Sequence, residues 1–501
     1  MIHQYKDIKM ISHKQSTAIK IDSVLTEGMG YRSAAFSFYI NLLAEFRSED
    51  LVLMESLGPG SPDSRISLVG IDPAIKIEVY DCTVSIAGNS KLINKIQSIY
   101  DGQHLITTTD QFLQYQLIER NEIWDFLRIL DSEFQGVKGG VLAFSIFSYN
   151  TIFFIEKISG YVKGDVPDIS LVCYKTYIEC THDHVTLHEY AYIGTDSIEA
   201  LRIMPYLTHR DRDLTPCPDK TFFINRETSK EDYLKKANTA LKHVQIGDVY
   251  QIQIGQKITI TCEVSSLEVY RRLRLLNPSP YMYLLDCGSY RVIGASPESF
   301  IYMNEQKLVM RPIAGTLGKS FVSSKEEAIA EFQSNAKEVA EHMMLVDLCR
   351  NDLSRISSPQ SLAVSELMSV EEYSHVYHMV STTKSEVKSG LDKYDVIQAS
   401  FPAGTMTGTP KIRAIELISD IEDSGRGLYA GALGVISLGA NFVNTALCIR
   451  STVEYNGEFT LRASAGVVAD SVLEGEYLET LHKMGSVFKA ITSEEISCHI
   501  A

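Results

Sequence analysis

The sequence lacks any long hydrophobic run. No stretch of its 501 residues approaches the ~20 apolar residues of a membrane-spanning helix, and residues 1–7 lack the apolar core of a secretory signal. Positive charge is also scarce, because 47 Lys and Arg oppose 63 Asp and Glu, giving a formal net charge of −16. A nucleic-acid binder would need clustered positive charge to meet phosphates. These shortages argue against a membrane protein and against a nucleic-acid-binding protein.

Closely spaced cysteine pairs are missing as well. The nine cysteines are odd in number and form no CxxC motif, and the closest two, Cys173 and Cys180, are seven residues apart. This pattern predicts free thiols in a reducing cytoplasm and excludes a zinc site or a disulfide framework. The 45% hydrophobic content is ordinary for a globular protein and excludes global disorder.

Turn and strand patterns change character near residue 220. Residues 1–20 are polar and Lys-rich, so we expect them to fray. Short β-rich runs over 51–86 and 137–190 flank a segment, 90–130, of helical character. Residues 205–220 are charged and contain prolines, which makes them the candidate linker.

The second half alternates helices and strands. Ser229 should cap a helix that Gly247 ends, and 250–262 reads as a strand. Further elements are predicted as helices at 264–276, 323–348, 391–399, 409–422 and 473–492, and as strands at 281–286, 291–295, 298–303, 428–437, 442–453 and 458–468. We predict an α+β fold with an N-terminal β-rich subdomain, 1–220, and a C-terminal catalytic domain, 221–501.

Two of the predicted helices carry paired carboxylates. Glu338 and Glu341 are three residues apart, and Glu476 and Glu479 repeat this spacing, so each pair shares a helix face. Four carboxylates could hold a hard divalent ion such as Mg²⁺ and leave sites for water and an anionic substrate. Such acidic pairs are more often solvated helix faces, so the spacing alone leaves both interpretations open.

Three segments rich in small residues could form anion-binding turns. In 401–411, Thr409 is predicted as the N-cap and Pro410 as the first residue of a helix, whose backbone N–H groups could face a carboxylate. The alternative is a simple capped helix start. Residues 311–316 and 464–467 are further glycine turns.

Single charged or titratable residues stand out in otherwise apolar surroundings. His378 lies in an apolar run, where a histidine is more often a core residue than a catalyst. Arg450 follows an apolar strand and needs an anionic partner, which a substrate carboxylate or an acidic side chain could supply. Glu298 follows a turn; in a dry cleft it would be a proton donor, and on an exposed strand it would be inert.

Read in order, these segments resemble the chorismate-utilising enzymes over nearly the whole chain. The matching motifs are PIAGT (312–316), EHMMLVDLCRNDLSRI (341–356), SHVYHMVS (374–381), FPAGTMTGTPKIRA (401–414) and GLYAGALGV (427–435). The large subunit of anthranilate synthase is most similar. Gln251 stands where water-using isochorismate and salicylate synthases carry a lysine base, and Ala314 where many aminodeoxychorismate synthases carry a lysine that attacks the ring.

The resemblance implies a fold of large antiparallel sheets packed together and flanked by helices. It also implies conversion of chorismate to anthranilate and pyruvate, using ammonia and Mg²⁺. The roles that it implies are Mg²⁺ ligands at Glu341, Glu479, Glu338 and Glu476, an acid at Glu298, a residue assisting pyruvate loss at His378, an ammonia site at Gln251, and substrate contacts at Thr405, Tyr429, Arg450, Gly466, Ala465 and Thr316.

Regulation and a partner are implied in the same way. A tryptophan feedback site resembling that of anthranilate synthases would comprise Glu55, Ser56, Asn277, Pro280, Tyr281 and Met282. No cysteine lies in a G-x-C-x-G elbow, so a separate glutamine amidotransferase subunit is expected to supply the ammonia.

Three departures from the family pattern keep alternatives open. The segment 317–320 replaces a common Arg-Pro-Arg-Gly turn, Ser464 replaces a usual glycine, and Asn444 replaces a usual aspartate. The alternatives are a 2-amino-2-deoxyisochorismate synthase without the lyase step, a 4-amino-4-deoxychorismate synthase, and a non-catalytic subunit that binds chorismate or tryptophan.

Overall fold

The structure is a computed structural model. It describes residues 8–13, 16–21, 34–58, 66–100, 105–137, 139–181, 184–190, 202–207, 221–373 and 376–500. Most of the candidate linker, 208–220, and positions 374–375 of the SHVYHMVS motif lie outside the described residues.

Every strand pairing among the described residues is antiparallel, and the strands form two limbs that meet where β4 pairs with β9. Limb A runs through β9 (Ile169–Cys180), β8 (Val141–Phe147), β21 (Ala432–Leu438), β22 (Phe442–Leu447), β15 (Ser299–Asn304), β16 (Lys307–Met310) and β19 (Val376–Glu386), with β17 (Ile313–Gly318) and β18 (Ala363–Glu372) also on β19.

Limb B leaves from the other strand of that pair. It runs through β4 (Ser67–Tyr80), β3 (Leu51–Glu55), β13 (Tyr281–Asp286), β14 (Arg291–Ser296), β23 (Ser451–Tyr455), β24 (Glu458–Val467) and β12 (Gln251–Cys262), with β11 (Phe222–Arg226) and β20 (Gly408–Thr409) also on β12. The outer strands are β10 (Val185–Glu189), β2 (Ser16–Ile21) and β1 (Ile8–His13) beyond β9, and β5 (Thr83–Gly88), β7 (Phe112–Gln116) and β6 (Leu105–Thr109) beyond β4.

The two limbs pack against each other through apolar side chains. Phe144 on β8 and Leu433 on β21 belong to one buried cluster with Val52 on β3 and Tyr283 on β13. Because β3 pairs with β13 and β8 with β21, the two predicted domains share strand ladders. The boundary at residue 220 stays a prediction.

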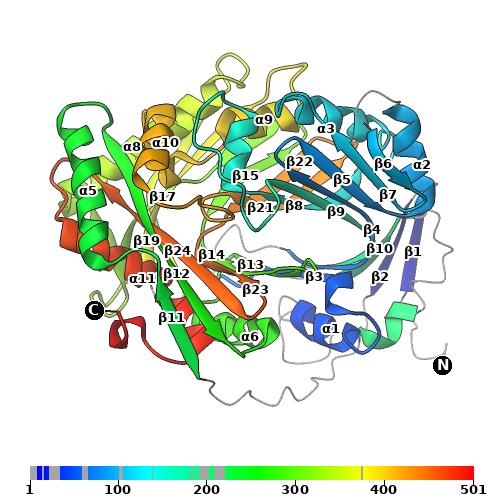
Figure 1. Cartoon of the computed structure of the whole chain (residues 1–501), viewed down its shortest axis with the longest axis horizontal. Helices are drawn as coiled ribbons and strands as arrows, with labels where there is room; N and C mark the ends of the chain where they lie inside the picture. The colour runs from blue at the N-terminus through cyan, green and yellow to red at the C-terminus, as the bar shows by residue number, and fades with distance from the viewer. Residues whose placement is uncertain are drawn as a thin grey trace.

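Helices cover the outer faces of the limbs (Figure 1). On limb B, α11 (Leu473–Thr492) packs on β24, α5 (Lys230–Gln245) on β12 and α6 (Ser266–Leu276) on β14. The others are α1 (Ala34–Leu42), α2 (Ser90–Ile99), α3 (Glu122–Ser132), α7 (Lys325–Ser334), α8 (Ala336–Ser354), α9 (Lys393–Ser400) and α10 (Lys411–Ile421). The predicted cap of α5 is confirmed, since the Ser229 side chain accepts a hydrogen bond from Asp232 N at 3.1 Å. The predicted α+β class is confirmed.

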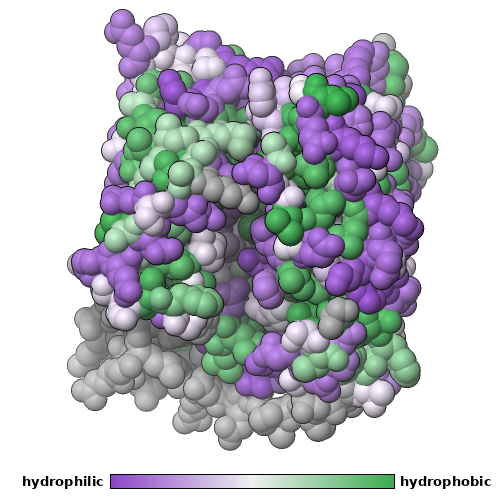
Figure 2. All heavy atoms as spheres, turned by 90° about the vertical axis from the view of Figure 1, so that its left-hand side faces the viewer, coloured by the Kyte–Doolittle hydropathy of each residue, from purple (hydrophilic) through white to green (hydrophobic). Residues whose placement is uncertain are grey.

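The surface is hollowed on the side of the molecule that carries α5 and α11, and hydrophilic residues border the hollow (Figure 2). Among the described residues, no helix is both long and apolar enough to cross a membrane.

Several sequence expectations are wrong in detail. Residues 8–13 and 16–21 form a hairpin that pairs with β10, although fraying is expected over 1–20. Between α2 and α3, the expected helical segment contains the hairpin β6–β7 instead, because the β-branched threonines at 107–109 favour a strand. The helix expected over 323–348 breaks at Asn335, whose side chain caps α8, and the strand expected over 442–453 breaks at Arg450, whose φ is 53°.

Two expected turns are also corrected. Thr409 is not a helix cap, because it pairs with Gln251 in the short strand β20; Pro410 is the N-cap and α10 begins at Lys411. Residues 464–467 are not a turn, because they lie inside β24. At 311–316, a kink is present, since Gly315 has φ 76° and β17 changes register there.

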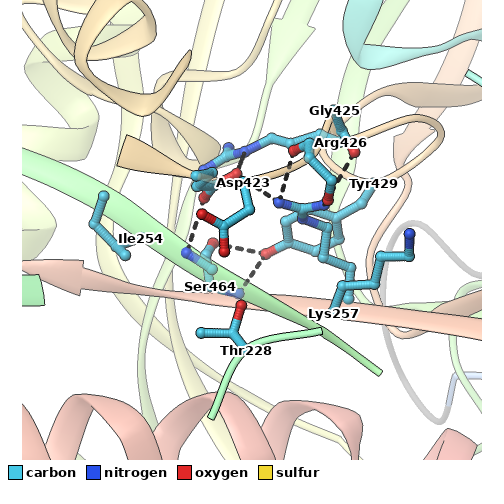
Figure 3. Close-up of polar contacts among 12 residues, drawn as sticks. Thr228, Ile254, Lys257, Asp423, Gly425, Arg426, Tyr429 and Ser464 are labelled. Carbon is cyan, nitrogen blue, oxygen red and sulfur yellow. Dashed lines mark hydrogen bonds and ion pairs between the residues drawn. The ribbon is translucent and has the colours of Figure 1, made fainter. Parts of the chain in front are cut away.

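A buried ion cluster joins β12, β24 and the segment after α10 (Figure 3). Glu422 binds Arg426 at 2.8 Å and Arg462 at 2.8 Å, and it also accepts the Gly255 backbone N–H at 2.9 Å. Burial alone would raise the pKa of Glu422, but the two arginines lower it to about 2. The cluster therefore stays charged inside the protein.

Breaking this cluster should destabilise the fold strongly. Glu422→Gln leaves two buried guanidinium groups uncompensated, and we expect a loss of about 3–5 kcal/mol in the free energy of unfolding, measured by urea denaturation. Because the folded pKa lies below the ordinary value of 4.5, this contribution is complete above pH 4.5 and is lost as the pH falls toward 2.

The matched control is Glu416→Gln on α10. Glu416 pairs with Arg413 at 3.0 Å on the surface, so its loss should cost at most about 1 kcal/mol. Equal losses for the two variants would contradict a structural role for the cluster.

Candidate active site

A cavity of about 290 Å³ lies between the far ends of the two limbs. Strands β12 and β24 supply one wall, β17 and β19 another, and helices α8 and α11 contribute carboxylates. The predicted residues that line it are Gln251, Glu298, Ala314, Thr316, Glu338, Glu341, His378, Thr405, Tyr429, Arg450, Gly466, Glu476 and Glu479. Segments far apart in the sequence thus meet at one site.

The four predicted metal ligands reach the cavity from two helices, Glu338 and Glu341 from α8 and Glu476 and Glu479 from α11. Carboxylate oxygens are the donors that Mg²⁺ prefers, so the chemistry of the set fits. The side chains are not gathered into a ligand sphere, because no three His, Cys, Asp or Glu side chains of the described chain form a group that could hold a metal. One reason is Lys483, whose Nζ lies 2.5 Å from Glu479 Oε1.

Glu298 is placed as a proton donor. It immediately precedes β15, and only 8% of its surface is exposed. Burial raises the pKa of Glu298 to about 8, against the opposing effects of the Thr405 hydroxyl and Lys483. Thr405 Oγ1 donates to Glu298 Oε1 at 3.3 Å, which fixes the carboxyl group. At neutral pH it is therefore a protonated acid at the cavity wall.

His378 on β19 is placed as a neutral imidazole. Its Nδ1 lies 3.2 Å from the Gly315 carbonyl oxygen and 3.1 Å from Thr316 Oγ1. Since a carbonyl only accepts, Nδ1 carries the proton and Nε2 keeps its lone pair. Burial lowers the pKa of His378 to about 4. The ring can therefore accept a proton at neutral pH.

Arg450 faces the cavity without an acidic partner. It lies on the link between β22 and β23, where Nη1 donates to the His482 carbonyl at 3.3 Å. No carboxylate of the described residues forms an ion pair with it; burial lowers the pKa of its guanidinium group, against the smaller opposing effects of Tyr429 and Glu479. The site can therefore hold an anionic group of a ligand.

Tyr429 and Ser464 (Figure 3) form a series of hydrogen bonds that continues to Gln253 on the neighbouring strand β12. Ser464 N donates to Tyr429 Oη at 2.8 Å, the two hydroxyl oxygens lie 2.7 Å apart, and Ser464 Oγ donates to Gln253 Oε1 at 2.9 Å. Arg426 of the ion cluster donates to the Gln253 carbonyl at 2.9 Å. The cluster thus supports this wall from behind.

Lining residues that the sequence reasoning missed include Gln253, Arg462 and Lys483. Simple spacings would have found Gln253 and Lys483. Gln253 is two residues from Gln251 on one strand face, and Lys483 is one helical turn from Glu479.

Some predicted residues do not face the cavity. Ala465 is fully buried and is not among the lining residues. Of the three departures from the family pattern, only Ser464 lines the cavity; Asn444 lies in β22, and Lys319 pairs with Glu372 at 2.7 Å.

The two halves of the predicted tryptophan site lie side by side. Met282 pairs with Glu55 across β13 and β3. The Glu55 carboxylate is already held by Arg274 Nε at 2.8 Å and Tyr270 Oη at 2.7 Å. Tryptophan binding by Glu55, Ser56, Asn277, Pro280, Tyr281 and Met282 stays a prediction.

Comparison with known proteins accounts for this combination of residues. Residues 89–489 match the family of chorismate binding enzymes. The chain belongs to this family. It is 36% identical over 479 residues to a 2-amino-4-deoxychorismate synthase of Streptomyces globisporus, covering 93% of this chain and 95% of the relative. It is 30% identical over 491 residues to an anthranilate synthase component 1 of Pseudomonas putida, covering 92% and 93%.

A solved structure supports the same assignment. Anthranilate synthase component I from Streptococcus pneumoniae TIGR4 matches with a TM-score of 0.69 at 26% identity, covering 92% of this chain and 99% of that one. The predicted chorismate-utilising fold, with a large antiparallel sheet and flanking helices, is confirmed.

Gly466 should be required for an open chorismate site. A Cβ at this position would lie 2.6 Å from Gln251 Nε2 and 3.0 Å from Gln253 Nε2, so Gly466→Ala should push both amides into the cavity. We expect the affinity for chorismate, measured by calorimetry, to fall about tenfold or more. The Tm should change little, because the displaced amides are the ends of flexible side chains.

Gly475→Ala is the control, since a Cβ there meets nothing within 4 Å. It should leave the affinity unchanged. An unchanged affinity in Gly466→Ala would contradict this placement of the amides.

Proposed function

We propose that this chorismate-binding enzyme adds ammonia at C2 of chorismate and releases the aminated product with its enolpyruvyl group still attached. The observation that carries the proposal is Glu298, a buried carboxyl group with a pKa of about 8 on the wall of the cavity. It can give its proton to the C4 hydroxyl, which leaves as water while ammonia bonds to C2 and both ring double bonds shift by one position. The new ammonium group then loses a proton.

The neutral residues of the site support ammonia as the nucleophile. Gln251 and Ala314 line the cavity where a lysine base or a lysine nucleophile would otherwise stand. Lys483 is engaged, because its Nζ pairs with Glu479 at 2.5 Å and donates to the Ser464 carbonyl at 2.9 Å. No free amine therefore replaces ammonia on the described walls.

We propose that Mg²⁺ is the cofactor. Glu341 and Glu479 would hold it, with Glu338 and Glu476 binding directly or through water. When bound, the ion would supply positive charge to the ring carboxylate of chorismate. Glu298 and Thr405 lie outside that set and are joined to each other by their own hydrogen bond at 3.3 Å.

A second candidate is anthranilate formation, and His378 favours it. A neutral imidazole can remove the C2 proton, after which the C–O bond to the enolpyruvyl group breaks and pyruvate leaves. The resemblance to anthranilate synthases supports this product. The S. globisporus relative and the departure at Ser464 favour release before that step.

We further propose that a glutamine amidotransferase subunit supplies the ammonia. The relatives named component 1 support this, because the name describes one part of a larger enzyme. Ammonium salts should replace that partner in vitro.

The defining experiment is a product analysis of the purified chain with chorismate, Mg²⁺ and an ammonium salt. We expect chorismate to be consumed and an aminated adduct with its enolpyruvyl group to appear by mass spectrometry. Anthranilate with equimolar pyruvate would establish the second candidate. No turnover, either with ammonia or with glutamine and an amidotransferase subunit, would overturn the proposal.

The metal requirement is tested in the same assay. Chelation, Glu341→Gln and Glu479→Gln should each abolish turnover, whereas Glu474→Gln, an exposed position in the first turn of α11, should not. Activity that survives loss of either ligand would contradict the metal assignment.

The pH dependence should report Glu298. Because its pKa is about 8, the acid is protonated below that pH, and the rate per free ammonia should fall about tenfold per pH unit above it. His378, with a pKa of about 4, adds no break between pH 5 and 8. Glu298→Gln should lower the rate by about 10²–10⁴ and remove the break; a wild-type profile without a break would contradict the role of Glu298.

A further inference from the structure

Ser464 ties up the hydroxyl group of Tyr429. Ser464 is 1% exposed and lies on β24 opposite Gly255, with Tyr429 beside it (Figure 3). Its hydroxyl group also donates to Gln253 Oε1. The backbone at this point is held from the other side, because Lys483 donates to the Ser464 carbonyl at 2.9 Å. The serine is therefore fixed in main chain and side chain.

The direction of the hydrogen bonds that join Tyr429, Ser464 and Gln253 follows from counting their hydroxyl protons. Ser464 has one hydroxyl proton and gives it to Gln253 Oε1 at 2.9 Å. Its oxygen must then accept the proton of Tyr429, whose own oxygen accepts the Ser464 N–H at 2.8 Å. The single O–H of Tyr429 is thus used inside the protein, and toward the cavity the phenol can only accept.

This matters because Tyr429 neighbours Arg450, which forms no ion pair with the described residues. Both Tyr429 and Arg450 line the cavity, and the phenol is close enough to Arg450 to affect the pKa of its guanidinium group. A carboxylate bound to Arg450 needs further donors, and a phenol that can only accept repels it. Without Ser464, the O–H would be free to point at that carboxylate.

We propose that Ser464 is a positioning residue that withholds the Tyr429 hydroxyl from the enolpyruvyl carboxylate and thereby favours release of the aminated adduct over pyruvate elimination. The inference rests on the proposed function and explains its choice of product. Elimination removes the C2 proton and breaks the C3–O bond to the enolpyruvyl group, whose electron pair leaves with the oxygen and is protonated to give pyruvate. That C–O bond must be held roughly perpendicular to the ring plane, and two anchors on the carboxylate orient it better than one.

The test is Ser464→Ala, which keeps the strand and removes the hydroxyl. A freed Tyr429 O–H should bind the substrate carboxylate, so the KM and Kd for chorismate should each fall about tenfold, and the pyruvate released per chorismate consumed should rise. Ser145→Ala is the matched control, because Ser145 is buried in β8 and its hydroxyl donates to the Gly434 carbonyl at 3.2 Å. It should change neither the affinity nor the product ratio.

A double-mutant cycle tests whether the effect of Ser464 on affinity acts through the Tyr429 hydroxyl. Tyr429→Phe should cancel the gain of Ser464→Ala and should cost more affinity in that background than in the wild type. A purely structural role for Ser464 would not create this coupling. Unchanged KM and product ratio in Ser464→Ala, or a gain that Tyr429→Phe leaves intact, would overturn the inference.

Failure of the proposed function gives a different result. If the wild type binds chorismate by calorimetry but never aminates it, the proposed function is wrong, while the Kd of Ser464→Ala still tests the withheld hydroxyl. If Ser464→Ala does not fold, Ser464→Cys replaces it, because cysteine keeps the shape of the side chain with a weaker hydrogen-bonding group. Its KM, Kd and product ratio should change in the same directions to a smaller extent. Unchanged values in Ser464→Cys would overturn the inference.

Discussion

Glu422 lies inside the protein between Arg426 and Arg462, and the walls of the cavity depend on this arrangement. Arg426 Nη1 donates to the Met406 carbonyl at 2.7 Å and its Nη2 to the Gln253 carbonyl at 2.9 Å. One ion cluster thus holds the loop of Thr405, the strand of Gln253 and, through Arg462, the strand of Ser464. A buried carboxylate with two cations is costly to desolvate, and what it provides here is a fixed geometry.

Burial acts in opposite directions on the pKa values of Glu298 and His378. It raises the pKa of Glu298 to about 8 and lowers that of His378 to about 4, and in both cases the uncharged form is favoured. The acid keeps its proton and the imidazole keeps its lone pair over the same pH range. In the exposed part of the cavity, Glu479 forms an ion pair with Lys483 at 2.5 Å.

The sequence predicted much of the fold and of the site, for identifiable reasons. The predicted helix 473–492 and strand 281–286 match the structure to the residue. In each, the hydrophobic residues recur with a clear period and the flanking residues mark a clear end. The prediction of Thr409 as a helix cap was wrong, because its strand pairing with Gln251 outweighs the local signal for a helix start. Ser464 bonds to Tyr429, 35 residues away in the sequence, and to Gln253, 211 residues away. A local sequence pattern cannot reveal contacts between residues so far apart.

Lys483 connects the carboxylates with the Tyr429 wall. Its ammonium group binds Glu479 at 2.5 Å and the Ser464 carbonyl at 2.9 Å, so it competes with any cation for that carboxylate. Because Ser464 also holds the Tyr429 hydroxyl, this one serine contacts both the acidic end of the cavity and the wall beside Arg450. The departure from the family pattern that lies in the cavity therefore occupies the position at which these two halves of the site meet.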